Sequence, residues 1–263
     1  MPRPLWRLPL IALREAAHGQ GRSRVPEPMA MDETESVDQF HEGGTTMGAM
    51  LAVYDLNARA LDALVPEGGR LLDLGVGSGR ALQRFLAMRP DVAATGVDLA
   101  PNMLARARRF LDDSGVGHRV TLIDGDMTAL PDHVTNEKWD AISSVWTLHH
   151  LPDSDVLRAA LRQIAEIRAR DGSAVWLLDF HRLRYPNSFR ALVDVLQQDV
   201  PPFLLADGLA SEAAAFTHDE LRTELAAAGL GNLESGLARP IRLLQAFWCQ
   251  GRARGRSVST PGR

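Results

Sequence analysis

Between residues 50 and 250, short apolar runs alternate with longer segments in which apolar residues recur every three or four positions. The longer segments predict amphipathic helices, and strands that alternate with helices are typical of a parallel sheet covered on both faces. The short runs predict buried strands at 70–74, 92–97, 119–123, 140–146 and 174–178. The pattern therefore predicts a three-layer, Rossmann-like α/β fold.

The C-terminal third of the chain departs from this alternation. Residues 185–216 have helical character but contain Pro201, Pro202 and Gly208, which predicts an inserted cap rather than one more strand and helix. Thr217 and Glu220 have the spacing of a capping box, which predicts a helix that ends at Gly229. Two further apolar runs, 233–237 and 241–249, predict a closing antiparallel hairpin.

Composition indicates a globular protein with one large domain: the chain has 263 residues, of which 45% are hydrophobic and 24% are charged. The net charge of −4 argues against a protein that binds nucleic acid mainly through phosphate contacts. The single cysteine, Cys249, excludes an internal disulfide, and its apolar surroundings predict a buried, inert thiol. No apolar segment has the length needed to span a bilayer, so a cytoplasmic protein without membrane or nucleic-acid partners is expected.

Both ends of the chain are rich in arginine and short of long apolar segments. Residues 1–30 are predicted to be a disordered leader, with Met29 or Met31 as alternative starts, and residues 251–263 a disordered basic tail. Residues 31–66, which include a helix-like stretch at 47–64, are predicted to form a helical cap or lid. The main domain is then expected to span residues 67–250.

The segment from Leu71 to Arg80 joins the first strand to a helix through three glycines in a G-x-G-x-G pattern. Dinucleotide-binding turns have the spacing G-x-G-x-x-G, and a P-loop requires a following Lys and Ser or Thr, so neither is predicted here. Asp73 lies two residues before the first glycine. A carboxylate at this turn disfavours a phosphate and favours a cationic group of the ligand.

Three further motifs follow in order: Gly96-Val97-Asp98-Leu99, Gly125-Asp126-Met127 and Ser143–Pro152. With the glycine turn, they make the chain resemble the class I S-adenosylmethionine-dependent methyltransferases over roughly residues 50–249. The resemblance implies a seven-stranded, mostly parallel sheet with an antiparallel last strand, and a cofactor bound across the carboxyl ends of the first strands.

The resemblance also implies roles for individual residues. Asp98 would bind both ribose hydroxyls, Asp126 the adenine amine, the Met127 N–H a ring nitrogen, and Asp73 the cofactor ammonium through water. Tyr54 either closes the pocket or only packs against its neighbours. The residues expected to contact S-adenosylmethionine, or the product S-adenosylhomocysteine, are Tyr54, Asp73, Gly75, Val76, Gly77, Gly79, Asp98, Leu99, Met103, Asp126, Met127 and Trp146.

Candidate catalytic chemistry follows the fourth strand, where His149 and His150 occupy a loop. An imidazole titrates near neutral pH, so one of them is predicted to act as the base; one packing and one exposed histidine is the alternative. His181 and Arg182, after the fifth strand, are predicted to bind an anionic acceptor, unless they are solvated. His41 and Glu42 have no partner at metal-ligand spacing, so residues 39–44 are predicted to be a lid loop and no metal site is expected.

These residues predict methyl transfer to an oxygen, nitrogen or carbon atom of a small molecule by a monomer or homodimer. The fourth strand lacks the Asn/Asp-Pro-Pro-Tyr/Phe sequence that would indicate methylation of a base or an amide nitrogen. A catalytically inactive sensor or partner subunit that binds the cofactor is the alternative. An NAD-dependent oxidoreductase is disfavoured by the glycine spacing.

Overall fold

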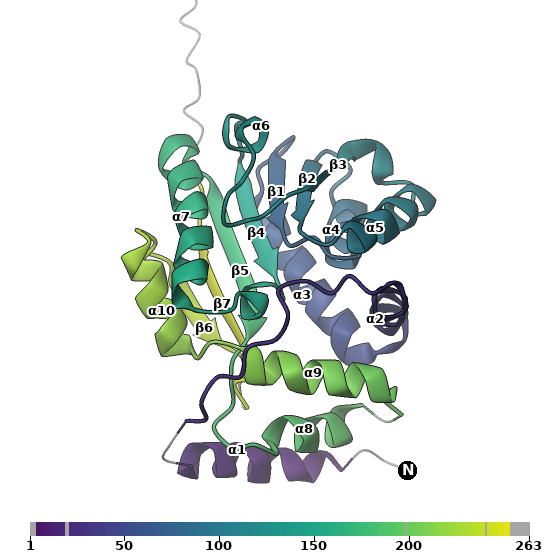
Figure 1. Cartoon of the computed structure of the whole chain (residues 1–263), viewed down its shortest axis with the longest axis vertical. Coiled ribbons are helices and arrows are strands. Elements are labelled where there is room, and N and C mark those ends of the chain that lie inside the picture. Colours follow the sequence, from purple (N-terminus) through teal and green to yellow (C-terminus); the bar gives the residue numbers. More distant parts are fainter. Residues whose placement is uncertain (1–3, 19–20, 198, 240, 253–263) are drawn as a thin grey trace, which may run out of the picture.

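The computed structural model describes residues 4–18, 21–197, 199–239 and 241–252, and it has a seven-stranded sheet at its centre (Figure 1). The strand order is β3-β2-β1-β4-β5-β7-β6. Strand β7 is antiparallel to both of its neighbours, and the remaining strand pairs are parallel. The strands are β1 (Arg70–Leu74), β2 (Ala93–Asp98), β3 (Val120–Asp124), β4 (Ala141–Val145), β5 (Ala174–Phe180), β6 (Glu234–Leu237) and β7 (Leu244–Cys249). The predicted fold class and the closing hairpin are confirmed.

Helices cover both faces of the sheet (Figure 1). The helices α3 (Gly48–Leu64), α4 (Arg80–Met88) and α5 (Pro101–Asp113) pack on one face. The helices α7 (Ser154–Asp171) and α10 (His218–Ala227) pack on the other, and the short α6 (Asp132–Thr135) lies beside them. Helix α10 begins with the predicted capping box at Thr217.

The two faces of the sheet bury separate cores because side chains alternate along each strand. In β1, Leu71 belongs to the core under α3 to α5, and Leu72 belongs to the core under α7 and α10. In β5, Trp176 belongs to the core under α3 to α5, and Val175 belongs to the core under α7 and α10. The near-continuous apolar runs in the sequence therefore reflect strands that are buried on both faces.

The predicted insert forms two helices, α8 (Ser188–Leu196) and α9 (Pro202–Ala214), beyond the carboxyl ends of the strands (Figure 1). The segment α2 (Thr34–Thr46) packs against α3, α5 and α9. The prediction of a lid loop at 39–44 was wrong, because these residues continue α2 in spite of Gly43 and Gly44. Both glycines lie where a side chain would collide, Gly43 with Leu204 and Gly44 with Arg80.

The prediction of a disordered leader was also wrong for most of its length. After a single turn of η1 (Leu5–Arg7), α1 (Leu8–Ala17) packs on α8, with Ile11 buried in the same cluster as Leu192. Residues 21–33, called the strap below, then cross the carboxyl end of the sheet toward α2. Composition suggested disorder because the N-terminal segment is rich in arginine, whereas α1 is ordered by its contacts with distant residues of α8. The predicted basic tail lies outside the described residues beyond residue 252.

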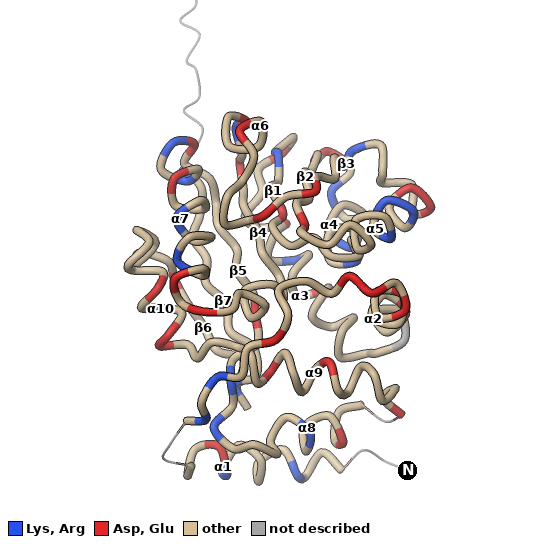
Figure 2. The backbone as a smooth tube through the Cα atoms, in the orientation of Figure 1, with Lys and Arg blue, Asp and Glu red and all other residues tan. Residues whose placement is uncertain are grey.

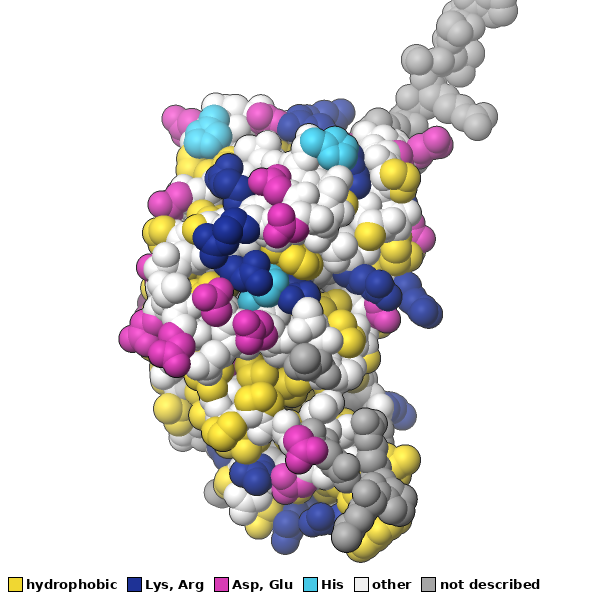
Figure 3. Space-filling model, turned by 90° about the vertical axis from the view of Figure 1, so that its right-hand side faces the viewer, with side chains coloured by type: hydrophobic (Ala, Val, Ile, Leu, Met, Phe, Trp, Pro, Cys, Tyr) yellow, Lys and Arg dark blue, Asp and Glu magenta, His cyan; other side chains and the backbone are white. Residues whose placement is uncertain are grey.

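Charge is unevenly distributed over the molecule. Basic residues occur in the first part of the strap, between α1 and the sheet. Acidic residues occur in α2 and in the end of the strap that adjoins it (Figure 2). In the side view, charged side chains of both signs occupy the upper half, and hydrophobic side chains gather in the lower half (Figure 3). Among the described helices, none is both long and apolar enough to cross a membrane. Cys249 is buried and free, as predicted.

Candidate active site

A cavity of about 410 Å³ lies at the carboxyl ends of β1, β2, β4 and β5. Its floor comes from the loops that follow these strands, and its roof comes from α8 and α9. The roof is mostly apolar, as the composition of the insert suggested, and includes Phe189, Leu192, Val193, Leu196, Leu204 and Leu205. A smaller cavity of about 30 Å³ adjoins it and shares Gly75, Asp98 and His150 with it.

The glycine turn forms one wall of both cavities. Gly75, Gly77 and Gly79 have φ values of 75°, 53° and 80°, which glycine adopts without the strain that a side chain causes. A β-carbon on Gly75 would collide with the Thr147 side chain, whereas one on Gly77 would meet nothing within 4 Å. The turn therefore packs tightly on the fourth-strand loop at Gly75 and leaves open space at Gly77.

Asp98 ends β2 and faces both cavities. Its carboxylate accepts hydrogen bonds from the backbone N–H groups of Gly77 (2.7 Å) and Ala100 (3.0 Å). Burial raises the pKa of Asp98, and these N–H groups oppose that rise. Asp126 and Met127 line the smaller cavity, and the Asp126 carboxylate accepts a hydrogen bond from the Thr128 N–H at 2.7 Å.

Most residues predicted to contact the cofactor line one of the two cavities, and two of them, Asp73 and Gly79, do not. Tyr54, Val76, Met103 and Trp146 line the larger cavity, and Leu99 lines the smaller one. Gly79 begins α4 and lies outside both cavities. Asp73 is buried beneath the turn, where its carboxylate accepts a hydrogen bond from the Ser143 hydroxyl at 2.6 Å. Burial raises the pKa of Asp73 to about 6.

Trp146 follows β4 with a φ of 54°, which is uncommon for a residue with a side chain. Its indole stacks on Phe180 with ring centroids 5.4 Å apart and meets Tyr54 edge to face at 5.8 Å. Its Nε1–H is buried and has no hydrogen-bond partner among the described residues. A non-glycine residue in this conformation on a cavity wall is typical of a functional site.

His149 lies in η3 (Leu148–His150), directly after β4, and its ring lines the larger cavity. Its Nδ1 lies 2.6 Å from Oδ1 of Asp179, and its backbone N–H donates to Oδ2 of the same carboxylate at 3.0 Å. Burial by itself would lower the pKa of His149. The carboxylates of Asp179 and Glu27 outweigh this effect and raise the pKa above its ordinary value.

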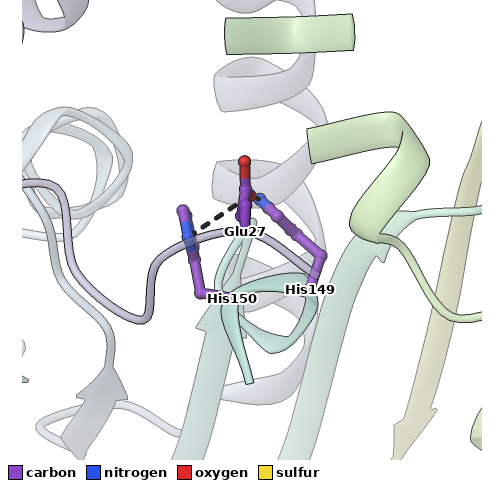
Figure 4. A group of neighbouring side chains, drawn as sticks. All are labelled: Glu27, His149 and His150. Carbon is purple, nitrogen blue, oxygen red and sulfur yellow. Dashed lines mark ion pairs between the residues drawn. The ribbon is translucent and has the colours of Figure 1, made fainter. Parts of the chain in front are cut away.

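Figure 4 shows Glu27 of the strap reaching between His149 and His150. Its Oε1 lies 3.3 Å from Nε2 of His149 and 3.3 Å from Nδ1 of His150. Burial raises the pKa of Glu27 and lowers that of His150 to about 3. Asp207 of α9 also faces His149 across the cavity, and burial raises its pKa to about 6.

The strap is held in place by Arg24, whose guanidinium donates to four backbone carbonyls. Three belong to the loop after β4, at His149 (2.8 Å), Leu151 (2.5 Å) and Pro152 (2.5 Å), and the fourth is Ala214 at the end of α9 (2.5 Å). At the far end of the strap, the carboxylate of Asp32 accepts a hydrogen bond from the Asn102 N–H at 2.8 Å. The strap therefore joins the loop, the roof and α5.

His181 and Arg182, which were predicted to bind the acceptor, line neither of these two cavities. The Arg182 guanidinium is buried and pairs with Glu220 at 2.7 Å, and it also donates to the carbonyl of Arg22. It therefore supports the strap from outside the cavity. The His181 backbone N–H donates to the carbonyl of Leu243 beside β7.

Comparisons with known proteins agree with this geometry. Residues 71–172 match a family model described as a methyltransferase domain. A malonyl-[acyl-carrier protein] O-methyltransferase from Geobacter sulfurreducens is 30% identical over 212 residues, which cover 78% of this chain and 73% of that protein. The chain belongs to the class I S-adenosylmethionine-dependent methyltransferases.

Other members of the methyltransferase family match over shorter regions or at lower identity. A demethylmenaquinone methyltransferase from Roseiflexus sp. is 32% identical over 156 residues, so the match covers 59% of this chain and only 60% of that protein. The match with a solved structure of a putative O-methyltransferase from Nostoc punctiforme covers 90% of this chain and 67% of the chain in that structure, with a TM-score of 0.59 and 19% identity. This second likeness supports the methyltransferase fold.

Sequence reasoning missed the residues that surround His149 in this methyltransferase. Asp179 was overlooked although it lies only two residues before His181, and an acid near a strand end is a usable signal. Asp207 was hidden in an apolar helix, and Glu27 lay in a segment expected to be disordered. Only the tertiary structure brings Glu27 and Asp207 to the histidine.

Proposed function

We propose that this chain transfers a methyl group from S-adenosylmethionine to an oxygen atom of a small, mainly apolar acceptor, with His149 as the base. The observation that carries the proposal is the pairing of His149 with Asp179 on the wall of a cavity that begins at the glycine turn. A buried imidazole held by a carboxylate is the arrangement that a hydroxyl acceptor needs, because its proton must leave as the oxygen reacts.

The residues at the turn fit the cofactor that the family uses. The open space at Gly77 lets the backbone approach a ligand closely, and the Asp98 carboxylate faces that space. We infer that Asp98 holds the ribose hydroxyls, that Asp126 and Met127 hold the adenine, and that Trp146 contacts the cofactor beside the acceptor. When bound, S-adenosylmethionine supplies a methyl group already activated by its positive sulfonium.

The Asp179 carboxylate determines which nitrogen of His149 carries the proton. Because Oδ1 of Asp179 lies 2.6 Å from Nδ1, the neutral imidazole keeps its proton on Nδ1 and presents an unprotonated Nε2. Nε2 then takes the proton of the acceptor hydroxyl, and Asp179 stabilises the resulting imidazolium. General-base catalysis of this kind contributes roughly 10²- to 10⁴-fold to the rate.

The size and lining of the cavity restrict the acceptor. A volume of about 410 Å³ lies in the range of small-molecule sites, and the methionine end of a bound cofactor would occupy part of it. The roof is apolar, whereas Asp207 and Ser211 place polar groups near His149. An apolar body with a hydroxyl at one end fits this distribution. The Geobacter relative is an O-methyltransferase, which also favours oxygen.

The experiment that tests the proposal follows the methyl group. The protein is incubated with methyl-labelled S-adenosylmethionine and a low-molecular-weight cell extract, and the labelled product is identified by mass spectrometry. We expect one labelled methyl ether with the wild-type protein and a large loss of product with His149→Gln, while S-adenosylhomocysteine binds both proteins equally. The absence of labelled product despite tight S-adenosylhomocysteine binding would favour a sensor, and near-native turnover of His149→Gln would exclude His149 as the base.

A further inference from the structure

Glu27, His149 and His150 come from two segments far apart in the chain and aim their polar atoms at one point (Figure 4). Oε1 of Glu27 lies 3.3 Å from Nε2 of His149 and 3.3 Å from Nδ1 of His150, and one potential ligand atom from each residue lies within 4.8 Å of the other two. We propose that these three side chains form a binding site for a divalent transition-metal ion of the Zn²⁺ class.

The distances match the edges of a metal coordination shell. Bonds of about 2.0–2.1 Å to Zn²⁺ in a tetrahedron place neighbouring ligand atoms about 3.3 Å apart. Oε1 of Glu27 lies 3.3 Å from each of the two imidazole nitrogens, so two edges already have this length. The third edge joins one nitrogen of each imidazole; the potential ligand atoms of the three residues all lie within 4.8 Å of one another, so this edge needs to shorten by no more than about 1.5 Å.

The bonding around the site leaves these atoms available. The Glu27 side chain is only 10% exposed, and its buried Oε1 receives no hydrogen bond among the described residues. An unsatisfied buried carboxylate oxygen is costly, and a cation would satisfy it. Nδ1 of His150 lies 3.1 Å from the carbonyl of Pro28, so metal binding requires the tautomer with its proton on Nε2 and replaces that contact.

The second shell has the arrangement seen around bound metals. Histidine ligands almost always donate their other ring N–H to a carboxylate or carbonyl, and Nδ1 of His149 has Asp179 at 2.6 Å. Asp207 adds a further carboxyl group near His149, which therefore interacts with three carboxyl groups, those of Glu27, Asp179 and Asp207. Arg24 fixes the strap through carbonyl contacts and thereby holds Glu27 in position.

The donor set determines which ion the site prefers. Two imidazole nitrogens and one carboxylate oxygen suit Zn²⁺, Co²⁺ or Fe²⁺, whereas Mg²⁺ and Ca²⁺ prefer shells of oxygen. Because His149 and His150 both line the cavity, the remaining coordination position would face the acceptor space. The ion would take the Nε2 lone pair that the proposed base uses, so metal binding and base catalysis by His149 exclude each other.

The test uses the full chain, stripped of metal by a chelator and titrated with Co²⁺. We expect one Co²⁺ per chain, with the visible absorption of a four-coordinate ion, and displacement by Zn²⁺ but not by Mg²⁺. Glu27→Gln and His150→Ala should each weaken Co²⁺ binding by at least tenfold, and Asp179→Asn should weaken it by about 10- to 100-fold. His133→Ala, which removes an exposed histidine on α6, is the matched control and should bind like the wild type.

Two outcomes would overturn the site: less than one bound Co²⁺ per wild-type chain, or unchanged Co²⁺ affinity in both ligand variants. Glu27→Gln is nearly isosteric, so it tests the site even if His150→Ala does not fold. These binding measurements do not depend on the proposed methyl transfer. Only one consequence does, namely that Zn²⁺ inhibits the metal-free enzyme and a chelator restores its activity. Metal binding by a protein that shows no methyl transfer even in its metal-free form would therefore refute the proposed function and leave the site intact.

Discussion

Replacing Asp179 with asparagine tests the central element of the proposed mechanism. The substitution keeps the size of the side chain but removes the charge that faces Nδ1 of His149 at 2.6 Å. An asparagine can turn its amide N–H toward Nδ1, which would place the imidazole proton on Nε2. The base would then have no lone pair to offer the acceptor.

The expected loss follows from what the base contributes. General-base catalysis supplies roughly 10²- to 10⁴-fold, so we expect kcat to fall by a factor in that range. Since each factor of ten corresponds to about 1.4 kcal/mol, the barrier should rise by about 3–5 kcal/mol. Cofactor affinity should stay unchanged, because Asp179 lines neither cavity.

The assay is the pH dependence of kcat at saturating cofactor. Nε2 must be unprotonated to act, so wild-type kcat should fall as the pH falls through the pKa of His149, which lies above its ordinary value. Removing the Asp179 charge lowers this pKa, so the acid limb should move to lower pH while the plateau drops. Asp113→Asn, an exposed Asp at the end of α5, is the matched control and should leave the profile unchanged.

One result would refute this reasoning: a kcat for Asp179→Asn within threefold of the wild type, with the acid limb in the same place. In that case, Asp179 would have a structural role, and positioning alone would account for catalysis. A lower melting temperature without a kinetic change would lead to the same conclusion, because the substitution also alters the bond from the His149 backbone N–H.

Three further predictions concern other parts of the site. Asp73→Asn should stabilise the protein above pH 6 by up to about 3 kcal/mol, because a pKa raised to about 6 marks a buried charge that destabilises the fold at high pH. The gain should vanish below the unfolded-state pKa near 3.8. Denaturant unfolding of both proteins at pH 4 and pH 8 measures this gain, and the same gain at both pH values would contradict the prediction. Asp98→Ala and Gly77→Val should each abolish S-adenosylhomocysteine binding in calorimetry, and micromolar affinity in either would mean that the cofactor lies elsewhere. Val193→Phe should raise the acceptor KM by filling the roof of the cavity and leave cofactor affinity unchanged; an altered cofactor affinity would show that the roof does not belong to the acceptor alone.

Periodicity in the sequence predicted the sheet well because buried strands and amphipathic helices leave local patterns. Strand β1 has the predicted bounds of 70–74, and the other parallel strands lie within two residues of their predicted limits. The acids at 98 and 126 were found in the same way, since Asp98 ends β2 and Asp126 lies two residues after the end of β3. Parallel strands bring such ends to one edge of the sheet, where they meet the cavity.

Contacts between residues far apart in the chain could not be predicted from the sequence. Pro28 and His150 are 122 residues apart in the chain, yet the strap places the carbonyl oxygen of Pro28 3.1 Å from Nδ1 of His150. Residues 21–33 have no regular secondary structure and therefore no periodicity to read. Their order comes from Arg24 and its four carbonyl partners, which belong to a loop and to the end of a helix.

The sequence by itself determined the fold class, the family resemblance and the place of the turn at Gly75, because these features depend on short segments whose conformation is set by residues close together in the chain. Only the tertiary structure decided that His149 is the histidine paired with Asp179, that Arg182 bonds to the strap and lines neither cavity, and that Glu27 completes a cluster of metal-binding type. These properties depend on burial and on distances between remote atoms, which exist only once the chain has folded.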